Sequence, residues 1–342
     1  MRALVKANPR AGLWLQDVPI PQVRDDEVLI KIRKTGICGT DLHIWNWDEW
    51  AQKTVPVPLV TGHEYAGEVV EVGRNVTQIS IGQRVSGEGH LVDLGCTAAR
   101  AGNFHLDPHS LSVGVNHPGA FAEYLALPAF NVIALPDEID DELGAILDPL
   151  GNAVHVAQSF DLVGNDVLIM GAGPIGIMAA AVARFVGAHR IFIADINAER
   201  LALANRIVDA ITLDPDNTSL TEVAQRYGLS DGFPIGFEMS GSNEALESLI
   251  GAMTSGGQIA CLGLPTRKVT LDWNTVVCKS LRIKGVYGRE MFETWRKTLN
   301  MLQSGLNVRD IITHRLPVDD FHAGFQAMQA GTAGKVILNW ST

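Results

Sequence analysis

Three side chains that could hold a metal ion come from two glycine-flanked segments of the first hundred residues. Cys38 directly precedes Gly39, and His63 and Glu64 directly follow Gly62. A thiolate, an imidazole and a carboxylate together suit a borderline-soft divalent cation, and zinc before any other. Closed structural zinc sites usually bring four cysteine or histidine ligands, so this mixed set is typical of an open catalytic site. The sequence therefore predicts metal-assisted chemistry.

A glycine-rich turn with the spacing G-x-G-x-x-G lies near the middle of the chain. Its glycines are Gly171, Gly173 and Gly176, between an apolar run at 166–170 and an apolar run at 175–186. The motif alone is weak, but a predicted strand before it and a predicted helix after it are the context that supports it. The glycines permit a tight turn and close approach to a pyrophosphate, which a helix N-terminus favours. We expect a dinucleotide site here.

Asp195 indicates which dinucleotide binds. It ends the next predicted strand, 19 residues after Gly176 (195 − 176). An acid at this position hydrogen-bonds the adenosine ribose hydroxyls and repels a 2′-phosphate, which favours NAD over NADP. Arg200 lies nearby and could accommodate a 2′-phosphate. With Asp195 at the strand end, we interpret Arg200 as a packing or adenine-side contact.

The elements that must position these residues fall into two regions. Residues 1–150 alternate short β-rich runs with glycine and proline, which predicts a twisted barrel with functional loops. From about residue 150, strands alternate with long apolar helices, the pattern of βαβ units and a parallel sheet. A chain of 342 residues exceeds the roughly 250–300 at which one core stops growing, so we expect two domains. The predicted strands are 28–32, 66–73, 81–85, 121–125, 166–170, 190–195, 258–263, 281–285 and 334–338.

Composition excludes some classes of partner. The net charge is −11, from 38 acidic against 27 basic residues, and no basic stripe of a nucleic-acid binder is present. The four cysteines lie far apart and form no disulfide-like framework, which favours a reducing compartment. The N-terminal residues show no secretory apolar region, and no apolar run approaches about 18 residues. We expect a cytoplasmic protein with no nucleic-acid and no membrane partner.

The motifs resemble those of the zinc-dependent medium-chain dehydrogenase/reductase family. His63 and Glu64, with Gly67, Gly73 and Val76, fit its zinc signature. Longer strings resemble the bacterial threonine dehydrogenases within it, at 37–41, 46–50, 85–90, 113–116, 148–155, 288–295 and 312–315. The resemblance implies an α/β fold in two domains. A GroES-like β-barrel catalytic domain takes residues 1–150 and is completed by 290–342, and a doubly wound Rossmann sheet that binds NAD takes 151–289.

The resemblance also implies an activity. It is the zinc-assisted oxidation of the L-threonine hydroxyl to 2-amino-3-oxobutanoate, with hydride transfer to NAD, by a homotetramer. Zinc bound to an alcohol oxygen lowers its pKa, and a hydroxyl–imidazole relay near working pH carries the proton away. The family's catalytic zinc ligands fall on Cys38, His63 and Glu64, its proton relay on Thr40 and His43, and an acid beside the site on Asp148. Its cofactor contacts fall on Gly171, Gly173, Ile175, Gly176, Asp195, Arg200, Leu262, Gly263, Leu264, Val286 and Tyr287.

Three roles stay open at this point. Glu64 either ligates the metal directly or yields to water. Asp148 either serves the site or caps a helix, as an Asp before Pro commonly does. His90 either touches the substrate or lines the wall of the site.

The substrate has alternatives as well. A polyol or butanediol dehydrogenase would share the same motifs, and only the substrate wall would differ. For threonine, Asp48, Glu49 or Glu88 could meet the ammonium, and Arg289 or a backbone nest could meet the carboxylate. A non-catalytic NAD-binding protein on the same fold is disfavoured, because the metal and relay residues are all present together.

The sequence departs from the family in one segment. Threonine dehydrogenases of this type usually carry a second, structural zinc on four cysteines spaced C-x₂-C-x₂-C-x₇-C. The corresponding residues here are Asp93, Cys96, Ala99 and Asp107. Ala99 cannot ligate, and one thiolate with two carboxylates makes a poor closed site. We therefore predict that this lobe, residues 91–112, holds no metal and that each chain binds one catalytic zinc.

Overall fold

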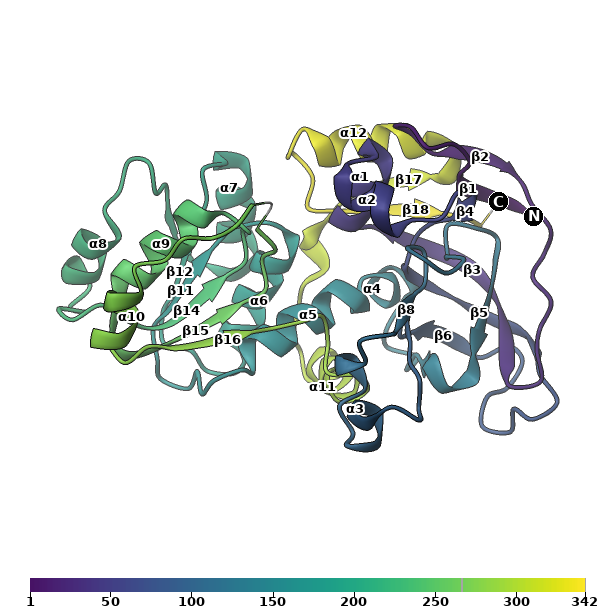
Figure 1. Ribbon diagram of the computed structural model, residues 1–342, viewed down its shortest axis with the longest axis horizontal. Coiled ribbons are helices and arrows are strands. Elements are labelled where there is room, and N and C mark those ends of the chain that lie inside the picture. The colour runs from purple at the N-terminus through teal and green to yellow at the C-terminus, as the bar shows by residue number, and fades with distance from the viewer. Residues whose placement is uncertain (266, 342) are drawn as a thin grey trace. The chain divides into compact units, whose positions relative to one another are not determined.

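The computed structural model describes residues 1–265 and 267–341, and Thr266 and Thr342 lie outside the described residues. The chain forms two compact units (Figure 1). The first comprises Met1–Asp148, Glu290–Gln303 and Ile312–Thr342, and the second comprises Pro149–Arg289 and Ser304–Ile311. The chain therefore leaves the second unit at Arg289, re-enters it for eight residues from Ser304, and ends in the first.

The second unit, as far as it is described, is built on a six-stranded parallel sheet in the order β13-β12-β11-β14-β15-β16. Counted along the chain this order is 3-2-1-4-5-6, that of doubly wound dinucleotide-binding sheets. The α/β fold with a doubly wound sheet is thereby confirmed. The strands are β11 (Val167–Met170), β12 (Ile191–Ala194), β13 (Ile211–Leu213), β14 (Phe233–Glu238), β15 (Met253–Cys261) and β16 (Arg282–Gly285).

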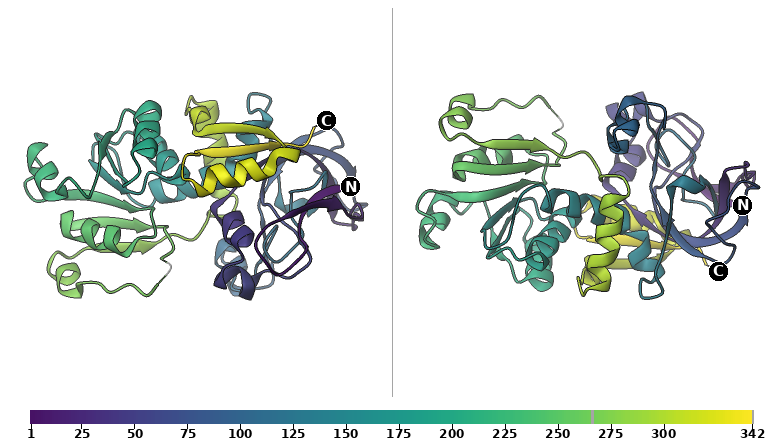
Figure 2. Two further views of the ribbon diagram at one scale, coloured as in Figure 1. Left: turned by 90° about the horizontal axis from the view of Figure 1, so that it is seen from above. Right: turned by 90° about the horizontal axis from the view of Figure 1, so that it is seen from below.

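Helices cover both faces of this sheet (Figure 2). One face carries α6 (Pro174–Phe185) and α7 (Ala198–Val208), and the other carries α8 (Leu220–Arg226), α9 (Asn243–Ala252) and α10 (Trp273–Cys278). Because both faces are covered, the central strands β11 and β12 are buried at every residue. Helix α5 (Leu147–Ala157) precedes β11, and the short η3 (Arg309–Ile311) contacts α6 and α7.

The first unit is built on a strongly curved, mainly antiparallel sheet. Its described strands follow the order β10-β6-β5-β3-β18-β17, with β9 also on β3, and β2-β1-β4 form a second sheet. Their bounds are β1 (Arg2–Lys6), β2 (Trp14–Asp17), β3 (Glu27–Ile37), β4 (Leu59–Val60), β5 (Glu64–Val72), β6 (Arg84–Gly87), β9 (Tyr124–Pro128), β10 (Val132–Ala134), β17 (Ile312–Pro317) and β18 (Lys335–Asn339). Strand β18 pairs with β3, so the end of the chain lies beside its first third.

Several short helices complete this unit. They are α1 (Gly39–Asn46), α2 (Glu49–Thr54), α4 (Asp141–Ala145), α11 (Glu293–Gln303), α12 (Phe321–Gln329), η2 (Ala129–Asn131) and η4 (Val318–Asp320). The lobe at 91–112 contains α3 (Thr97–Arg100) and η1 (Phe104–Leu106), and it is closed by the pair β7 (His90–Leu91) and β8 (Leu111–Ser112). No helix in the described ranges combines the length and apolar character needed to span a membrane.

Two predicted strands begin three residues later than expected. The run at 81–85 opens with an exposed Ile81 and a left-handed Gly82, so β6 starts only at Arg84. The run at 121–125 begins with an isolated bridge between Ala3 and Ala122, and β9 starts at Tyr124. Strand β14 was not predicted at all, because Pro234 and Gly236 interrupt its sequence pattern.

Candidate metal centre and dinucleotide site

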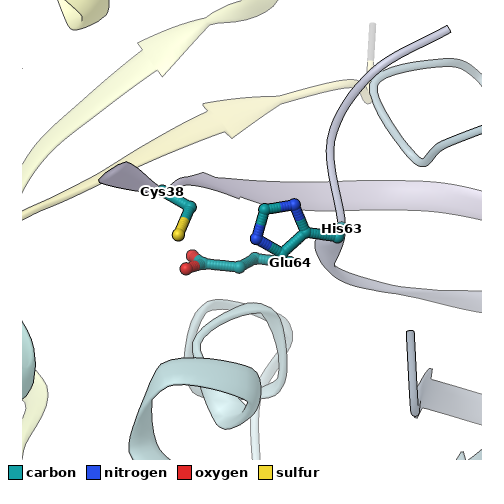
Figure 3. Close-up of side chains that lie close together, drawn as sticks. All are labelled: Cys38, His63 and Glu64. Carbon is teal, nitrogen blue, oxygen red and sulfur yellow. The ribbon is translucent and has the colours of Figure 1, made fainter. Parts of the chain in front are cut away.

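The predicted metal ligands lie together in the first unit. Cys38 follows the end of β3, His63 directly precedes β5, and Glu64 is the first residue of β5. The two strands are antiparallel neighbours with Gly36 opposite Glu64, so their register brings the segments together. The sulfur, an imidazole nitrogen and a carboxylate oxygen all lie within 4.8 Å of one another (Figure 3).

Two glycines make room for this cluster. A Cβ on Gly36 would collide with the carboxylate of Glu64. Gly62 has a left-handed backbone with φ of 87°, and a Cβ there would collide with the ring of Phe121. The glycines beside the ligands are therefore needed for the geometry of the cluster.

The donor atoms fit a divalent metal ion. Among the described residues, Oε1 of Glu64 is buried without a hydrogen-bond partner. Burial lowers the pKa of His63, but the charges of Cys38 and Asp41 raise it more, to about 10. An imidazole that attracts a proton this strongly lies in a negative environment, which a cation would neutralise. Three protein ligands also leave a fourth position open, as catalytic zinc requires.

Lys335 was missed by the sequence analysis. Its Nζ is buried on β18, forms an ion pair with Oε2 of Glu64, and donates to the carbonyl of Ile37 at 2.8 Å. Burial lowers the pKa of Lys335, but the charges of Glu64, Cys38 and Asp41 and the bond to Glu64 together outweigh burial and leave the pKa raised. One oxygen of Glu64 thus holds an internal cation, and the other is the oxygen available to a metal.

The predicted relay residues lie on α1, which begins just after Cys38. Thr40 and His43 are three residues apart, so they share one face of the helix. The side chain of His43 is 53% exposed. Buried Asp41 accepts the N–H of Cys38 at 2.9 Å, and burial raises the pKa of Asp41 to about 6.

Asp148 and His90 are positioned separately. Asp148 is buried in the first turn of α5, and its negative charge contributes to the raised pKa of His63. His90 starts β7, and its Nδ1 lies 2.7 Å from Oε1 of buried Glu88. The other oxygen of Glu88 accepts the indole N–H of Trp295 at 2.8 Å. Glu88 therefore orients His90 and Trp295.

The glycine-rich turn lies between β11 and α6 in the second unit. Gly171 has φ of 108°, which disfavours other residues. A Cβ on Gly176 would collide with the carbonyl of Gly171, whereas a Cβ on Gly173 would meet no atom within 4 Å among the described residues. The outer glycines thus serve packing, and the middle one leaves the open surface that a pyrophosphate would approach.

Asp195 follows β12 and lies against this turn. Its Oδ2 accepts the N–H of Ala172 at 2.7 Å, and its Oδ1 accepts that of Asn197 at 2.8 Å. Arg200 lies 3.9 Å from the same carboxylate. Ile196, which follows Asp195, is 74% exposed.

The remaining predicted cofactor residues follow the carboxyl ends of β15 and β16. Leu262 and Gly263 donate their N–H groups to the carbonyl of Glu238 at the end of β14. Leu264 and Tyr287 are exposed, whereas Val286 is buried. These residues and the glycine-rich turn follow carboxyl ends of strands in one parallel sheet, which is where dinucleotides bind in such sheets.

The lobe at 91–112 differs from the metal centre. Asp107 accepts the N–H of Asp93 at 2.8 Å and that of His109 at 2.9 Å. The sulfur of Cys96 accepts the N–H of Ala99 at 3.3 Å. Across residues 1–265 and 267–341, the one group of three or more close potential ligands is Cys38, His63 and Glu64, and none lies in the lobe.

Comparisons with known proteins agree with this architecture. The family "Alcohol dehydrogenase GroES-like domain" matches residues 24–137, and the family "Zinc-binding dehydrogenase" matches residues 174–304. The L-threonine 3-dehydrogenase of Ruegeria pomeroyi is 60% identical over 342 residues, which is all of both chains. That of Chelativorans sp. is 56% identical over 99% of both chains.

Solved structures show the same fold. The 2R,3R-butanediol dehydrogenase of Bacillus subtilis superposes with a TM-score of 0.90, at 26% identity and 99% coverage of both chains. The galactitol-1-phosphate dehydrogenase of Escherichia coli has a TM-score of 0.91 at 24% identity, covering 99% of this chain and all of that one. At 24% identity, the similarity to the galactitol-1-phosphate dehydrogenase supports the fold and no statement about substrate.

Proposed function

Since the chain belongs to the zinc-dependent medium-chain dehydrogenase/reductase family, we propose that it is an oxidoreductase that oxidises the hydroxyl of L-threonine to 2-amino-3-oxobutanoate with NAD. The observation that carries this proposal is the full-length identity of 60% to an L-threonine 3-dehydrogenase, in a chain that keeps the Cys38, His63 and Glu64 cluster. The butanediol alternative is supported by a structure of much lower identity, 26%.

The metal centre supplies the electrophile. Cys38, His63 and Glu64 would hold zinc, which when bound polarises an alcohol oxygen, while NAD accepts the hydride. Lys335 holds one oxygen of Glu64, so the carboxylate presents its other oxygen to the metal. Whether that oxygen ligates directly is measured by extended X-ray absorption of the zinc-loaded enzyme and of Glu64→Gln.

The relay on α1 removes the hydroxyl proton. Thr40 lies one helical turn before His43, and the exposed His43 can release a proton to solvent. Histidine titrates near neutral pH, which suits it to accept and release that proton during turnover. The negative charge of Asp148 lies near His63 and contributes to the potential of the site.

The dinucleotide site favours NAD. The carboxylate of Asp195 lies at the glycine-rich turn and would repel a 2′-phosphate. A related putative zinc-binding dehydrogenase from Sinorhizobium meliloti, at 26% identity, was solved with NADP, so the choice needs a test. Wild-type enzyme should prefer NAD in kcat/KM, and Asp195→Ser should weaken that preference. Equal use of both cofactors by the wild type would contradict the assignment.

The proposed substrate is tested by an activity comparison. NADH formation is followed with L-threonine, 2,3-butanediol and sorbitol, after chelation and again after addition of Zn²⁺. L-Threonine should give the highest kcat/KM, and activity should vanish with chelator and return with zinc. A higher value for either alcohol would replace threonine, and NAD binding without turnover of any substrate would support the non-catalytic alternative.

The wider setting of the enzyme is also a proposal. The family resemblance supports a homotetramer in the cytoplasm that serves threonine catabolism, with a small-molecule substrate as its partner. The four cysteines are free in the structure, in keeping with a reducing compartment. Light scattering coupled to size-exclusion chromatography gives the subunit number, and a mass other than that of four chains would contradict the tetramer.

A further inference from the structure

The imidazole of His43 is held by the carboxylate of Asp48. Nδ1 of His43 lies 2.5 Å from Oδ2 of Asp48, and the ring of Trp50 lies edge-on to the imidazole at 5.9 Å. The second oxygen, Oδ1, accepts the N–H of Ala51 at 2.9 Å and caps α2. One carboxylate thus joins the predicted relay histidine to the start of the next helix.

The backbone between the two residues fixes this pair. Trp47 ends α1 in the left-handed region, with φ of 57°, and its N–H donates to the carbonyl of His43 at 3.0 Å. The buried ammonium of Lys6 donates to the carbonyl of Ile44 and lies 4.7 Å from the centre of the Trp47 ring. These contacts reverse the direction of the chain after α1. Asp48 therefore lies against the imidazole of His43, which is five residues earlier in the sequence.

The contact dictates a tautomer. Burial raises the pKa of Asp48, but the bonds from Ala51 and His43 outweigh it and hold the pKa below its ordinary range, so the carboxylate is ionised. An ionised carboxylate only accepts hydrogen bonds, so Nδ1 must carry the hydrogen in the neutral ring. Nε2 is then left as the acceptor, and the imidazolium that forms on proton transfer lies beside a negative charge.

We propose that Asp48 is a positioning residue of the proton relay, which keeps His43 in the tautomer whose Nε2 accepts the proton. In the step, the substrate hydroxyl gives its proton to the hydroxyl of Thr40, which passes its own proton to Nε2 of His43, and Asp48 stays ionised throughout. The imidazolium then returns the proton to water. This inference rests on the relay in the proposed function and adds a third member to it.

Two variants of Asp48 separate positioning from helix capping. Asp48→Ser removes the carboxylate but keeps a hydroxyl that caps α2, and Asp48→Asn keeps the cap but can offer an N–H to Nδ1. The matched control is Asp272→Ser, because Asp272 caps α10 through Asn274 and Thr275. No histidine contacts the Asp272 carboxylate in the described structure.

Two readouts on the intact enzyme test the proposal. Long-range ¹H–¹⁵N spectra of ¹⁵N-histidine-labelled protein should show the Nδ1–H tautomer of His43 in the wild type and the Nε2–H tautomer in Asp48→Asn. Both Asp48 variants should lower kcat about ten- to hundredfold, part of the full effect of a general base, with little change in KM for NAD. Asp272→Ser should keep the wild-type kcat. A wild-type tautomer or a wild-type kcat in Asp48→Asn overturns the proposal.

A third variant separates failure of this inference from failure of the relay. If His43→Gln keeps the wild-type kcat, the relay is wrong and Asp48 has no role in it. If His43→Gln is slow, the double variant His43→Gln/Asp48→Asn should be no slower, because Asp48 acts through His43. A double variant slowed by the product of both single effects would show that Asp48 acts independently and would overturn the proposal.

Discussion

Two regions of the first unit contain potential metal ligands, the cluster of Cys38, His63 and Glu64 and the lobe at 91–112. They differ in whether those ligands already accept hydrogen bonds. At the centre of Cys38, His63 and Glu64, the buried Oε1 of Glu64 has no hydrogen-bond partner in the described part of the chain. In the lobe at 91–112, the carboxylate of Asp107 already accepts two backbone N–H groups. A buried oxygen that lacks a partner gains its first one when it ligates a metal, whereas an oxygen that already accepts an N–H gains less. Unpaired buried donors are therefore the better sign of a metal site.

Charge separates the two regions as well. The cluster attracts cations strongly, as the raised pKa of His63 shows, even though Lys335 already offsets Glu64. In the lobe, bonds from the backbone of Asp93 and His109 outweigh other effects and hold the pKa of Asp107 below its ordinary range. The carboxylate of Asp107 thus organises the loop through hydrogen bonds, in the place where the family resemblance suggests a zinc ligand.

The largest expected effect comes from Cys38→Ser. Loss of the thiolate should release the zinc, and metal polarisation is worth several kcal/mol, so kcat should fall by about a thousandfold or more. Zinc content by inductively coupled plasma mass spectrometry should fall below one per chain, while NADH binding by fluorescence stays intact. Cys96→Ser is the matched control in the lobe, and it should keep both activity and zinc. A loss of one zinc in Cys96→Ser would show that the lobe binds metal.

A variant that gains metal binding also tests the prediction that the lobe holds no metal. The triple variant Asp93→Cys/Ala99→Cys/Asp107→Cys would place four thiolates where the N–H of Asp93 contacts Asp107 and the N–H of Ala99 contacts Cys96. Such a set suits a closed structural zinc site. We expect two zinc ions per chain in the variant against one in the wild type, and a higher Tm with zinc. Two tightly bound ions in the wild type would contradict the metal-free lobe.

The glycine-rich turn and the metal ligands could be predicted from the sequence, because short segments of the chain determine both. Gly171, Gly173 and Gly176 lie between an apolar strand and an apolar helix, and their spacing is itself the geometry of the turn. The metal ligands could be predicted in the same way, because Gly36, two residues before Cys38, marks the close approach of β3 and β5.

The contacts that were missed depend on distant residues or on unusual backbone. Lys335 meets Glu64 across 271 positions of the chain, and only the pairing of β18 with β3 brings them together. The pair of His43 and Asp48 is close in sequence, but it needs the left-handed Trp47 to form. Strand β14 was not predicted because Pro234 lowers the strand propensity of its sequence. In the structure, burial of β14 between β11 and β15 outweighs that low propensity.

A smaller effect should follow from removing the hydrogen-bond centre of the lobe. In Asp107→Ala, the N–H groups of Asp93 and His109 lose their acceptor, so their amides should exchange about ten- to hundredfold faster. Hydrogen exchange followed by NMR measures this, and the zinc content should stay at one per chain. Asp93→Ala is the control, since its carboxylate accepts mainly the neighbouring N–H of Gly95. Unchanged exchange in Asp107→Ala would show that other contacts hold the lobe.

The smallest expected effect is the response of the lobe to acid. The pKa of Asp107 is lowered from its ordinary 3.8, so its stabilising contribution is complete above 3.8 and is lost as the pH falls through the lower folded value. The carboxyl ¹³C shift of Asp107 should therefore titrate with a midpoint below pH 3.8. A metal bound to Asp107 would instead be displaced as its ligands gain protons, and the shift would depend on added zinc. A midpoint above 3.8 would contradict the role of the two N–H bonds, and a shift that moves on addition of zinc at neutral pH would assign this carboxylate to a metal and remove the contrast between the two regions.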